Sequence, residues 1–154
     1  MKLYLIQHGE ATTEEVDPSR PLSAKGRSDV RKIASFLKGA GVHPGLILQS
    51  GKTRARQTAE IIAGQLGPDC QVKEREGLGP NDPVKGIISE ISGTANDLMV
   101  VGHLPFMERL VSYLITGTPE KHVIRFRNAG IACLEYDRME NTWAIRWVLT
   151  PEIA

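Results

Sequence analysis

The stretch KLYLIQHG, residues 2–9, runs an unbroken apolar segment straight into a histidine. A continuous apolar run, with no polar residue from Leu3 to Ile6, is typical of a strand buried on both faces. The pattern recurs in LMVVGH, residues 98–103, which ends on His103. We therefore predict two buried strands, each followed at its carboxyl end by a histidine.

The rest of the chain alternates between strand-like and helix-like segments. Ser23 is a natural N-cap before an apolar face that repeats every three or four residues, and Gly39 and Gly41 end that helix. The alternation predicts an α/β fold, a three-layer sandwich with a mostly parallel central sheet flanked by helices and an antiparallel hairpin at its C-terminal edge. We expect strands over residues 2–7, 45–49, 71–74, 98–101, 129–136 and 142–149, and helices over residues 24–38, 52–66, 83–91 and 105–115.

Length and composition are those of an ordinary globular chain. We expect one domain spanning residues 1–154, and the formal net charge of +1, with 24% charged residues, gives no overall attraction to nucleic acid or to a membrane surface. Cys70 and Cys133 lie too far apart for a Cys-x-x-Cys motif, so we expect two reduced thiols. The N-terminus has no signal-peptide pattern. We predict a cytoplasmic monomer that binds neither nucleic acid nor membrane.

Charged and polar side chains gather where the predicted parallel strands end. In open α/β sheets, ligands bind at the carboxyl ends of the strands, where helix N-termini present free amides. His8, His103 and the Ser50–Gly51 turn before an arginine-bearing helix all map to this edge. Guanidinium groups, helix amides and imidazoles together favour a phosphate dianion. A neutral imidazole is also a competent nucleophile towards phosphorus, and His8, at the end of the central strand, is best placed for that role.

Alternatives for this cluster stay open on the residues alone. Two histidines could bind a metal ion with Glu10 as a third ligand, although arginines beside the site would repel the cation. Arg54 and Arg56 point in different directions on a helix, so periodicity cannot choose between them. We assign no catalytic role to His43 or His122.

Four segments resemble the histidine phosphatase superfamily, also called phosphoglycerate mutase-like, in sequence and in order. They are LIQHGE (residues 5–10), RPLSAKG (20–26), SGKTRARQTA (50–59) and VGHLP (101–105). The short length, the His-Leu-Pro segment and the loop LGPND (78–82) are most similar to the small SixA-type phosphohistidine phosphatases. The resemblance implies a phosphoglycerate mutase-like fold and a phosphatase that uses no cofactor and no metal ion.

The resemblance also implies a role for each matching residue. His8 would be the phosphorylated nucleophile, Arg54 the phosphate-binding arginine of the Arg-Ala-x-Gln-Thr motif, and His103 the histidine that stabilises the phosphoryl group during transfer. The residues expected to bind phosphate, or a sulfate ion in its place, are Gln7, Gly9, Arg20 and Arg54. The expected substrate is a phosphorylated protein, such as a histidine phosphotransfer domain, or a small phosphorylated molecule.

Gln7 departs from the family pattern, in which an arginine precedes the histidine. Loss of a charge-assisted bidentate contact to phosphate costs about 1.5–3 kcal/mol. The chain could therefore be a catalytically weak or inactive member that binds phosphate or a phosphoprotein. The cations available to compensate are Lys52, Arg20, Arg56 and Arg127.

Larger members of the superfamily carry an extra segment between the second helix and the fourth strand, which supplies a general acid. This chain has room there for only a strand, a loop and one helix, in which Glu74 and Glu76 are the acidic candidates. The P–N bond of phosphohistidine is labile and needs little proton donation. The short segment thus favours a phosphohistidine substrate, with small phosphate esters as the alternative.

Overall fold

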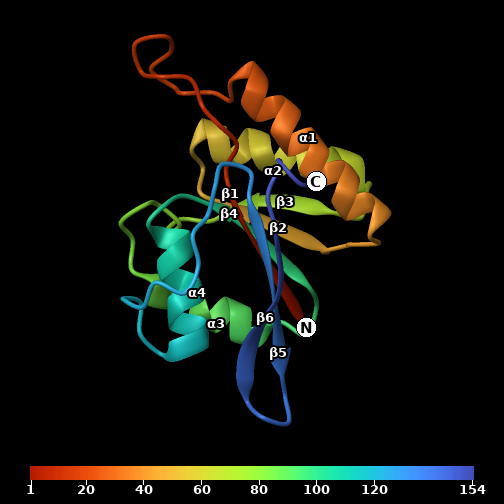
Figure 1. Ribbon diagram of the computed structural model, residues 1–154, viewed down its shortest axis with the longest axis vertical. Helices are drawn as coiled ribbons and strands as arrows, with labels where there is room; N and C mark the ends of the chain where they lie inside the picture. Colours follow the sequence, from red (N-terminus) through yellow and green to blue (C-terminus); the bar gives the residue numbers. More distant parts are fainter.

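The computed structural model describes residues 1–154 as one six-stranded sheet with helices on both faces (Figure 1). The strands are β1 (Lys2–Gln7), β2 (Leu46–Gln49), β3 (Gln71–Glu74), β4 (Leu98–Gly102), β5 (Ile131–Asp137) and β6 (Thr142–Leu149). The helices are α1 (Ala24–Gly39), α2 (Thr53–Leu66), α3 (Ile88–Gly93) and α4 (Phe106–Thr116), with a 3-10 helix, η1 (Val84–Ile87), directly before α3. None of these helices is long and apolar enough to span a membrane.

The two strands that precede the histidines are neighbours at the centre of the sheet. The strand order is β3-β2-β4-β1-β5-β6, and β1 pairs parallel with β4 and antiparallel with β5. The register pairs Gln7 with Gly102, so the residues that follow them leave the same edge side by side. β5 and β6 form the antiparallel hairpin expected at the end of the chain. The α/β class with a mostly parallel sheet is confirmed.

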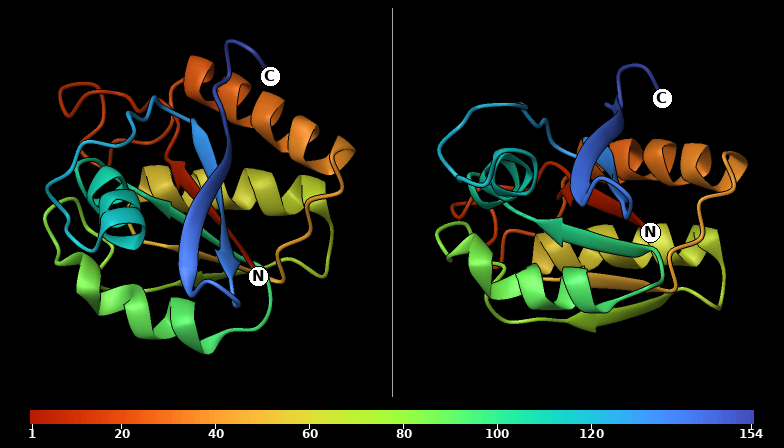
Figure 2. Two further views of the ribbon diagram at one scale, coloured as in Figure 1. Left: turned by 60° about the horizontal axis from the view of Figure 1, so that its bottom comes forward. Right: turned by 90° about the horizontal axis from the view of Figure 1, so that it is seen from below.

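Both faces of β1 are buried, which explains its unbroken apolar sequence. Tyr4 and Ile6 belong to an apolar cluster shared with α1 and α2, whereas Leu3 and Leu5 belong to a second cluster shared with α3 and α4. Figure 2 shows these two pairs of helices on opposite sides of the sheet. Each of the four side chains is at most 3% exposed. Burial of apolar area on both faces therefore stabilises the strand that leads to His8.

The segment expected to form one helix over residues 83–91 is instead two short helices. Pro83 has extended backbone angles before η1, and α3 begins only at Ile88. Gly86 lies inside η1, where its backbone freedom disfavours a continuous α-helix and its carbonyl accepts a hydrogen bond from Arg75 Nη2 at 2.7 Å. The other expected elements begin and end within two residues of the observed limits.

The start of α1 is fixed against the turn that follows β1. Ser23 caps the helix as expected, because its Oγ accepts from Gly26 N at 3.0 Å. The same hydroxyl donates to Glu10 Oε1 at 2.9 Å. Gly26 permits this close approach, since a Cβ there would clash with the Glu10 carbonyl. The turn carrying His8 and Gly9 is thereby attached to a rigid helix.

Candidate active site

His8 follows β1 and has one ring nitrogen free for chemistry. Its Nδ1 lies 2.7 Å from the carbonyl oxygen of Gly9, and because a carbonyl only accepts, Nδ1 carries the proton and donates it. Nε2 therefore presents a lone pair, which accepts a hydrogen bond from Arg54 Nε at 3.3 Å. Burial lowers the pKa of His8 to about 4 against the opposing effect of the Gly9 carbonyl, and the charges of Arg54 and Arg20 lower it further. The ring is neutral at neutral pH, as a nucleophile must be.

His103 follows β4 and lies beside His8. The two ring centroids are 5.0 Å apart, with the ring planes at 52°. Burial of the His103 ring, which is 1% exposed, lowers its pKa to about 3, with further contributions from His8, Arg54 and Lys52. Its Nε2 lies 2.6 Å from Ser50 Oγ, whereas its Nδ1 is buried without a partner. The sheet thus brings together the two histidines singled out in the sequence.

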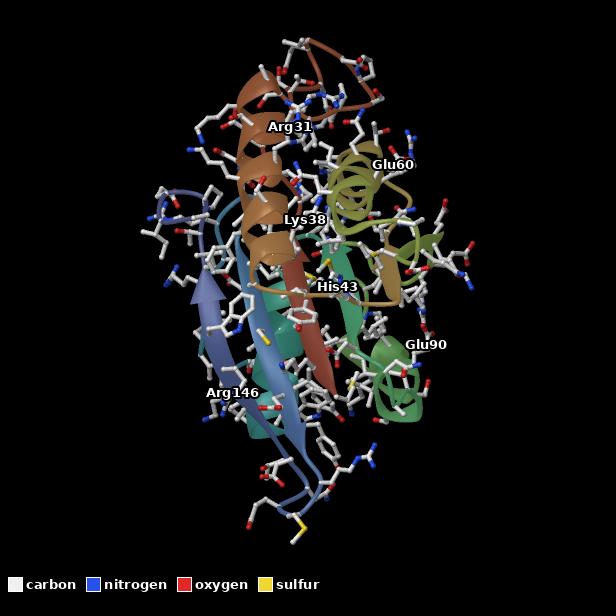
Figure 3. All side chains as sticks on the ribbon, turned by 90° about the vertical axis from the view of Figure 1, so that its right-hand side faces the viewer. Arg31, Lys38, His43, Glu60, Glu90 and Arg146 are labelled. Atoms are coloured by element: carbon white, nitrogen blue, oxygen red, sulfur yellow. The ribbon has the colours of Figure 1, made fainter.

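Arg54, and not Arg56, points into the site. Arg54 is half-buried in the first turn of α2 and reaches His8. Arg56 is exposed and pairs with Glu60 at 3.5 Å on the outer side of α2, where Figure 3 labels Glu60. Arg54 therefore lies on the side of α2 that faces His8, and Arg56 lies on the outer side, a choice that helix periodicity left open.

Gly9 and Thr58 fix His8 relative to α2. Gly9 N donates to Thr58 Oγ1 at 3.0 Å, and Thr58 Oγ1 donates to the Arg54 carbonyl at 2.8 Å. One fully buried hydroxyl therefore joins the turn that carries His8 to the helical turn that carries Arg54. No larger residue fits at position 9, since a Cβ there would lie 2.7 Å from Val30 Cγ2. Thr58 belongs to the motif segment of residues 50–59, but no sequence pattern indicated this bridging role.

Glu10, the third ligand of the alternative metal site, is engaged elsewhere. Its Oε1 accepts a hydrogen bond from Ser23 Oγ at 2.9 Å, at the cap of α1. The two histidines stand instead among cationic groups, whose charges disfavour a second positive charge at this position. The arrangement suits an anion better than a metal ion.

The other two histidines lie away from this cluster. His43 is exposed in the loop between α1 and β2, at the amino end of β2 and so at the opposite edge of the sheet (Figure 3). His122 is exposed in the segment between α4 and β5. Both therefore serve as natural controls for experiments on His8 and His103.

Gln7 is buried and holds the segment before β5. The side chain is 9% exposed, and its Nε2 donates to Asn128 Oδ1 at 2.8 Å. Its Oε1 is buried without a hydrogen-bond partner. Ala129 N donates to the carbonyls of Gln7 and His8, both at 3.1 Å. Gln7 thus joins residues 128–129 to the end of β1, a contact that no sequence pattern indicated.

Arg20 and Lys52 are the additional cations that act on the histidines of the site. Burial is the main cause of the low pKa of both histidines. The charge of Arg20 lowers both pKa values further, and the charge of Lys52 lowers that of His103. Arg56 is occupied on the outer side of α2, and Arg127 is exposed and acts on the C-terminal segment instead. Of the four cations considered for compensation, Arg20 and Lys52 therefore lower the pKa of a site histidine through their charge.

Glu74 and Glu76 border a polar hollow beside the histidines. The hollow is lined by Ser50, Gly51 and Lys52 from the β2–α2 turn and by the two glutamates and the loop that follows β3. Glu74 packs over Gly51, since a Cβ on that glycine would lie 2.6 Å from Glu74 Oε1. Both carboxylates are exposed, and neither is hydrogen-bonded to His8 or His103.

The chain is similar in sequence and in structure to histidine phosphatases. The sequence profile of the histidine phosphatase superfamily (branch 1) matches residues 3–79. An uncharacterised protein of Picosynechococcus sp. is 34% identical over 139 residues, which cover 85% of this chain and 82% of that protein. The phosphohistidine phosphatase SixA of Escherichia coli (strain K12) is 28% identical over 157 aligned positions, covering 98% of this chain and 94% of SixA. The solved structure of the protein histidine phosphatase SixA complexed with tungstate matches with a TM-score of 0.83 at 28% identity, over 98% of this chain and 97% of that one.

Proposed function

We propose that this chain removes the phosphoryl group from phosphohistidine in a protein through a covalent phospho-His8 intermediate. The chain belongs to the histidine phosphatase superfamily, which supports this proposal. The observation that carries the proposal is the unprotonated Nε2 of His8, 3.3 Å from Arg54 Nε and beside the ring of His103. A lone pair next to a guanidinium suits attack on phosphorus, because the same cation neutralises the oxygens of the phosphoryl group.

The first step transfers the phosphoryl group to the enzyme. His8 Nε2 attacks phosphorus, and the new N–P bond forms as the P–N bond of the substrate breaks. The substrate imidazole leaves with the electron pair of the broken bond, and it leaves neutral because its other ring nitrogen has taken a proton from solvent. The Gly9 carbonyl, which accepts from His8 Nδ1 at 2.7 Å, stabilises the positive charge that develops on the ring.

The second step releases inorganic phosphate. Water attacks phosphorus, the N–P bond breaks, and its electron pair returns to His8 Nε2. The proton lost by the water passes to the phosphate or to solvent. Arg54 and Arg20 bind the phosphoryl oxygens in both steps, and the neutral ring of His103 flanks them, so the charge of the transition state meets fixed donors.

The substrate class is supported by the short segment between α2 and β4. That segment holds only β3, η1 and α3, and its acidic candidates are exposed and not bonded to the histidines. A phosphoester needs proton donation to its leaving oxygen. A protonated phosphoramidate does not, because its leaving group departs as a neutral amine or imidazole. The near full-length similarity to SixA supports the same class and a phosphorylated protein as partner.

Hydrolysis by purified protein in the presence of EDTA tests the proposal. The substrates are phosphoramidate and a phosphohistidine-bearing phosphotransfer domain, and the variants are His8→Ala and, as matched control, His43→Ala. We expect wild type and His43→Ala to hydrolyse both at equal rates and His8→Ala to lose activity. A His8→Ala rate equal to wild type would contradict the covalent route, and loss of activity in EDTA would contradict independence from metal.

A member that binds phosphate without turnover is the second candidate, and Gln7 favours it. The amide of Gln7 donates to Asn128 and carries no charge, so part of the phosphate clamp of the family pattern is missing. Phosphate binding without hydrolysis of any phosphoramidate would support this candidate. Comparable rates on p-nitrophenyl phosphate and an alkyl phosphate would instead indicate a working general acid and an ester substrate.

A further inference from the structure

Ser50 lies at the point where β2 ends and contacts the site directly. Its Oγ is 2.6 Å from His103 Nε2, and the backbone N–H of Lys52 points to the same oxygen at a longer 3.4 Å. The side chain is half-buried and also lines the polar hollow beside the histidines. Ser50 therefore contacts both His103 and open space.

The proton of His103 decides what the Ser50 hydroxyl can do. His103 is neutral at neutral pH and carries a single N–H, on either Nδ1 or Nε2. Nδ1 is buried and has no partner, and an unpaired N–H is rarer and costlier in a protein interior than an unpaired acceptor. The proton is therefore on Nε2, and His103 donates it to Ser50 Oγ.

A count of hydrogen bonds then leaves one donor unused. A serine hydroxyl has two acceptor lone pairs and one O–H. The two donors that reach Ser50 Oγ, from His103 and Lys52, occupy its acceptor capacity, and no protein acceptor takes its own proton. Arg54 and Lys52 make the surroundings positive, so an anionic oxygen is a well-suited acceptor for this proton.

We propose that Ser50 is a further catalytic residue, whose hydroxyl donates to a phosphoryl oxygen held between His8, His103 and Arg54. This inference rests on the proposed phosphoryl chemistry and adds a neutral donor to a site in which position 7 has no guanidinium. It also gives His103 a defined task, since its hydrogen bond orients the hydroxyl that contacts the substrate.

Binding of inorganic phosphate, measured by calorimetry, tests Ser50 without requiring turnover. We expect Ser50→Ala to weaken phosphate binding and to lower kcat/KM by about tenfold each, the effect of one hydrogen bond to a charged group. Ser50→Thr keeps the hydroxyl and should stay close to wild type, whereas Ser50→Cys keeps the size with a weak donor and should behave like Ser50→Ala. Ser35→Ala, on α1 and hydrogen-bonded to Gln65, is the matched control and should change neither quantity.

The outcomes separate this inference from the proposed function. Weaker phosphate binding by Ser50→Ala, in a protein that hydrolyses none of the substrates, would support the contact between Ser50 and phosphate and contradict the proposed phosphatase activity. Wild-type affinity and rate for Ser50→Ala and Ser50→Cys, in an active enzyme, would overturn Ser50 alone. Failure of the wild type to bind phosphate would overturn both. Thermal unfolding of each variant shows whether a loss comes from the site or from the fold.

Discussion

His8 and His103 stand side by side because they follow two parallel strands whose register pairs Gln7 with Gly102. Their ring centroids are 5.0 Å apart, and His8 N donates to the Gly102 carbonyl at 3.0 Å. Burial and the nearby cations disfavour a proton on either ring. The pair therefore stays neutral at a pH where an isolated imidazole begins to charge, which affects both catalysis and stability.

We expect the nucleophile to stay available well into the acid range. The pKa of His8 is lowered to about 4, so its Nε2 keeps the lone pair at pH 5 and loses it as the pH falls through that value. Nitrogen-15 NMR of the ring measures this titration directly and avoids substrates that decompose in acid. A midpoint for His8 between pH 6 and 7 would contradict the assignment.

Stability should fall as the pH is lowered from neutral. Unfolded histidines take up protons around the ordinary value of about 6.5, whereas the folded state takes them up only near 4 for His8 and 3 for His103. Between these values the unfolded state binds more protons, so the free energy of unfolding decreases by at most about 1.4 kcal/mol per pH unit for each histidine. Urea unfolding at pH 7, 6 and 5 measures the slope, which should be shallower in His103→Leu than in wild type.

The positions of His8 and His103 could be predicted from sequence because their signal is local. An apolar run predicts a buried strand, and parallel strands end at one edge of a sheet. Helix periodicity could not predict the orientation of Arg54, since two residues of spacing do not say which side of the helix faces the sheet edge. Only the family resemblance selected Arg54 over Arg56. Within residues 83–91 the prediction of one helix was wrong, because Gly86 has a weak helix propensity and the segment forms a 3-10 helix followed by a short α-helix.

The contacts that complete the site join residues far apart in the chain. Gln7 and Asn128 are 121 residues apart, and Ser50 and His103 are 53 apart. Neither pair has a periodicity or a turn signal, because each contact depends on where one strand end lies against a distant segment. The family resemblance identified Gln7 as an unusual residue at its position, but its hydrogen bond to Asn128 is visible only in the structure.

Restoring an arginine at position 7 should strengthen phosphate binding. Gln7→Arg adds a guanidinium next to His8, and a charge-assisted contact adds about 1.5–3 kcal/mol, or roughly one to two orders of magnitude in affinity. Gln7→Met removes the bond to Asn128 without adding charge and isolates that loss. Phosphate calorimetry and turnover are measured on both variants. Little change in Gln7→Arg would mean that Arg20 and Lys52 already supply the charge, whereas turnover appearing from nothing would favour the binding-only candidate.

Thr58→Val should reduce both stability and activity. The methyl that replaces the hydroxyl leaves the buried N–H of Gly9 without its partner and removes the side-chain hydrogen bond to the Arg54 carbonyl, which costs about 1–3 kcal/mol of unfolding free energy. The turn that carries His8 then loses its tie to α2, so kcat falls more than the stability loss explains. Thr58→Ser keeps the hydroxyl and should preserve kcat. Equal kcat for Thr58→Val and wild type, at a temperature where both are folded, would contradict the positioning role.

Gly9→Ala tests whether packing against α1 sets the position of the nucleophile. The added Cβ would lie 2.7 Å from Val30 Cγ2, so we expect overpacking to destabilise the fold by about 1–3 kcal/mol and to displace His8. Val30→Ala removes the clashing methyl. The loss of unfolding free energy in the double variant should therefore be smaller than the sum of the losses in the two single variants. Urea unfolding and kcat of the four proteins form one cycle. Strictly additive losses would mean that Val30 is not the residue that excludes a side chain at position 9. Recovery of stability without recovery of kcat would mean that Gly9 is needed for the backbone geometry at His8 rather than for packing against Val30.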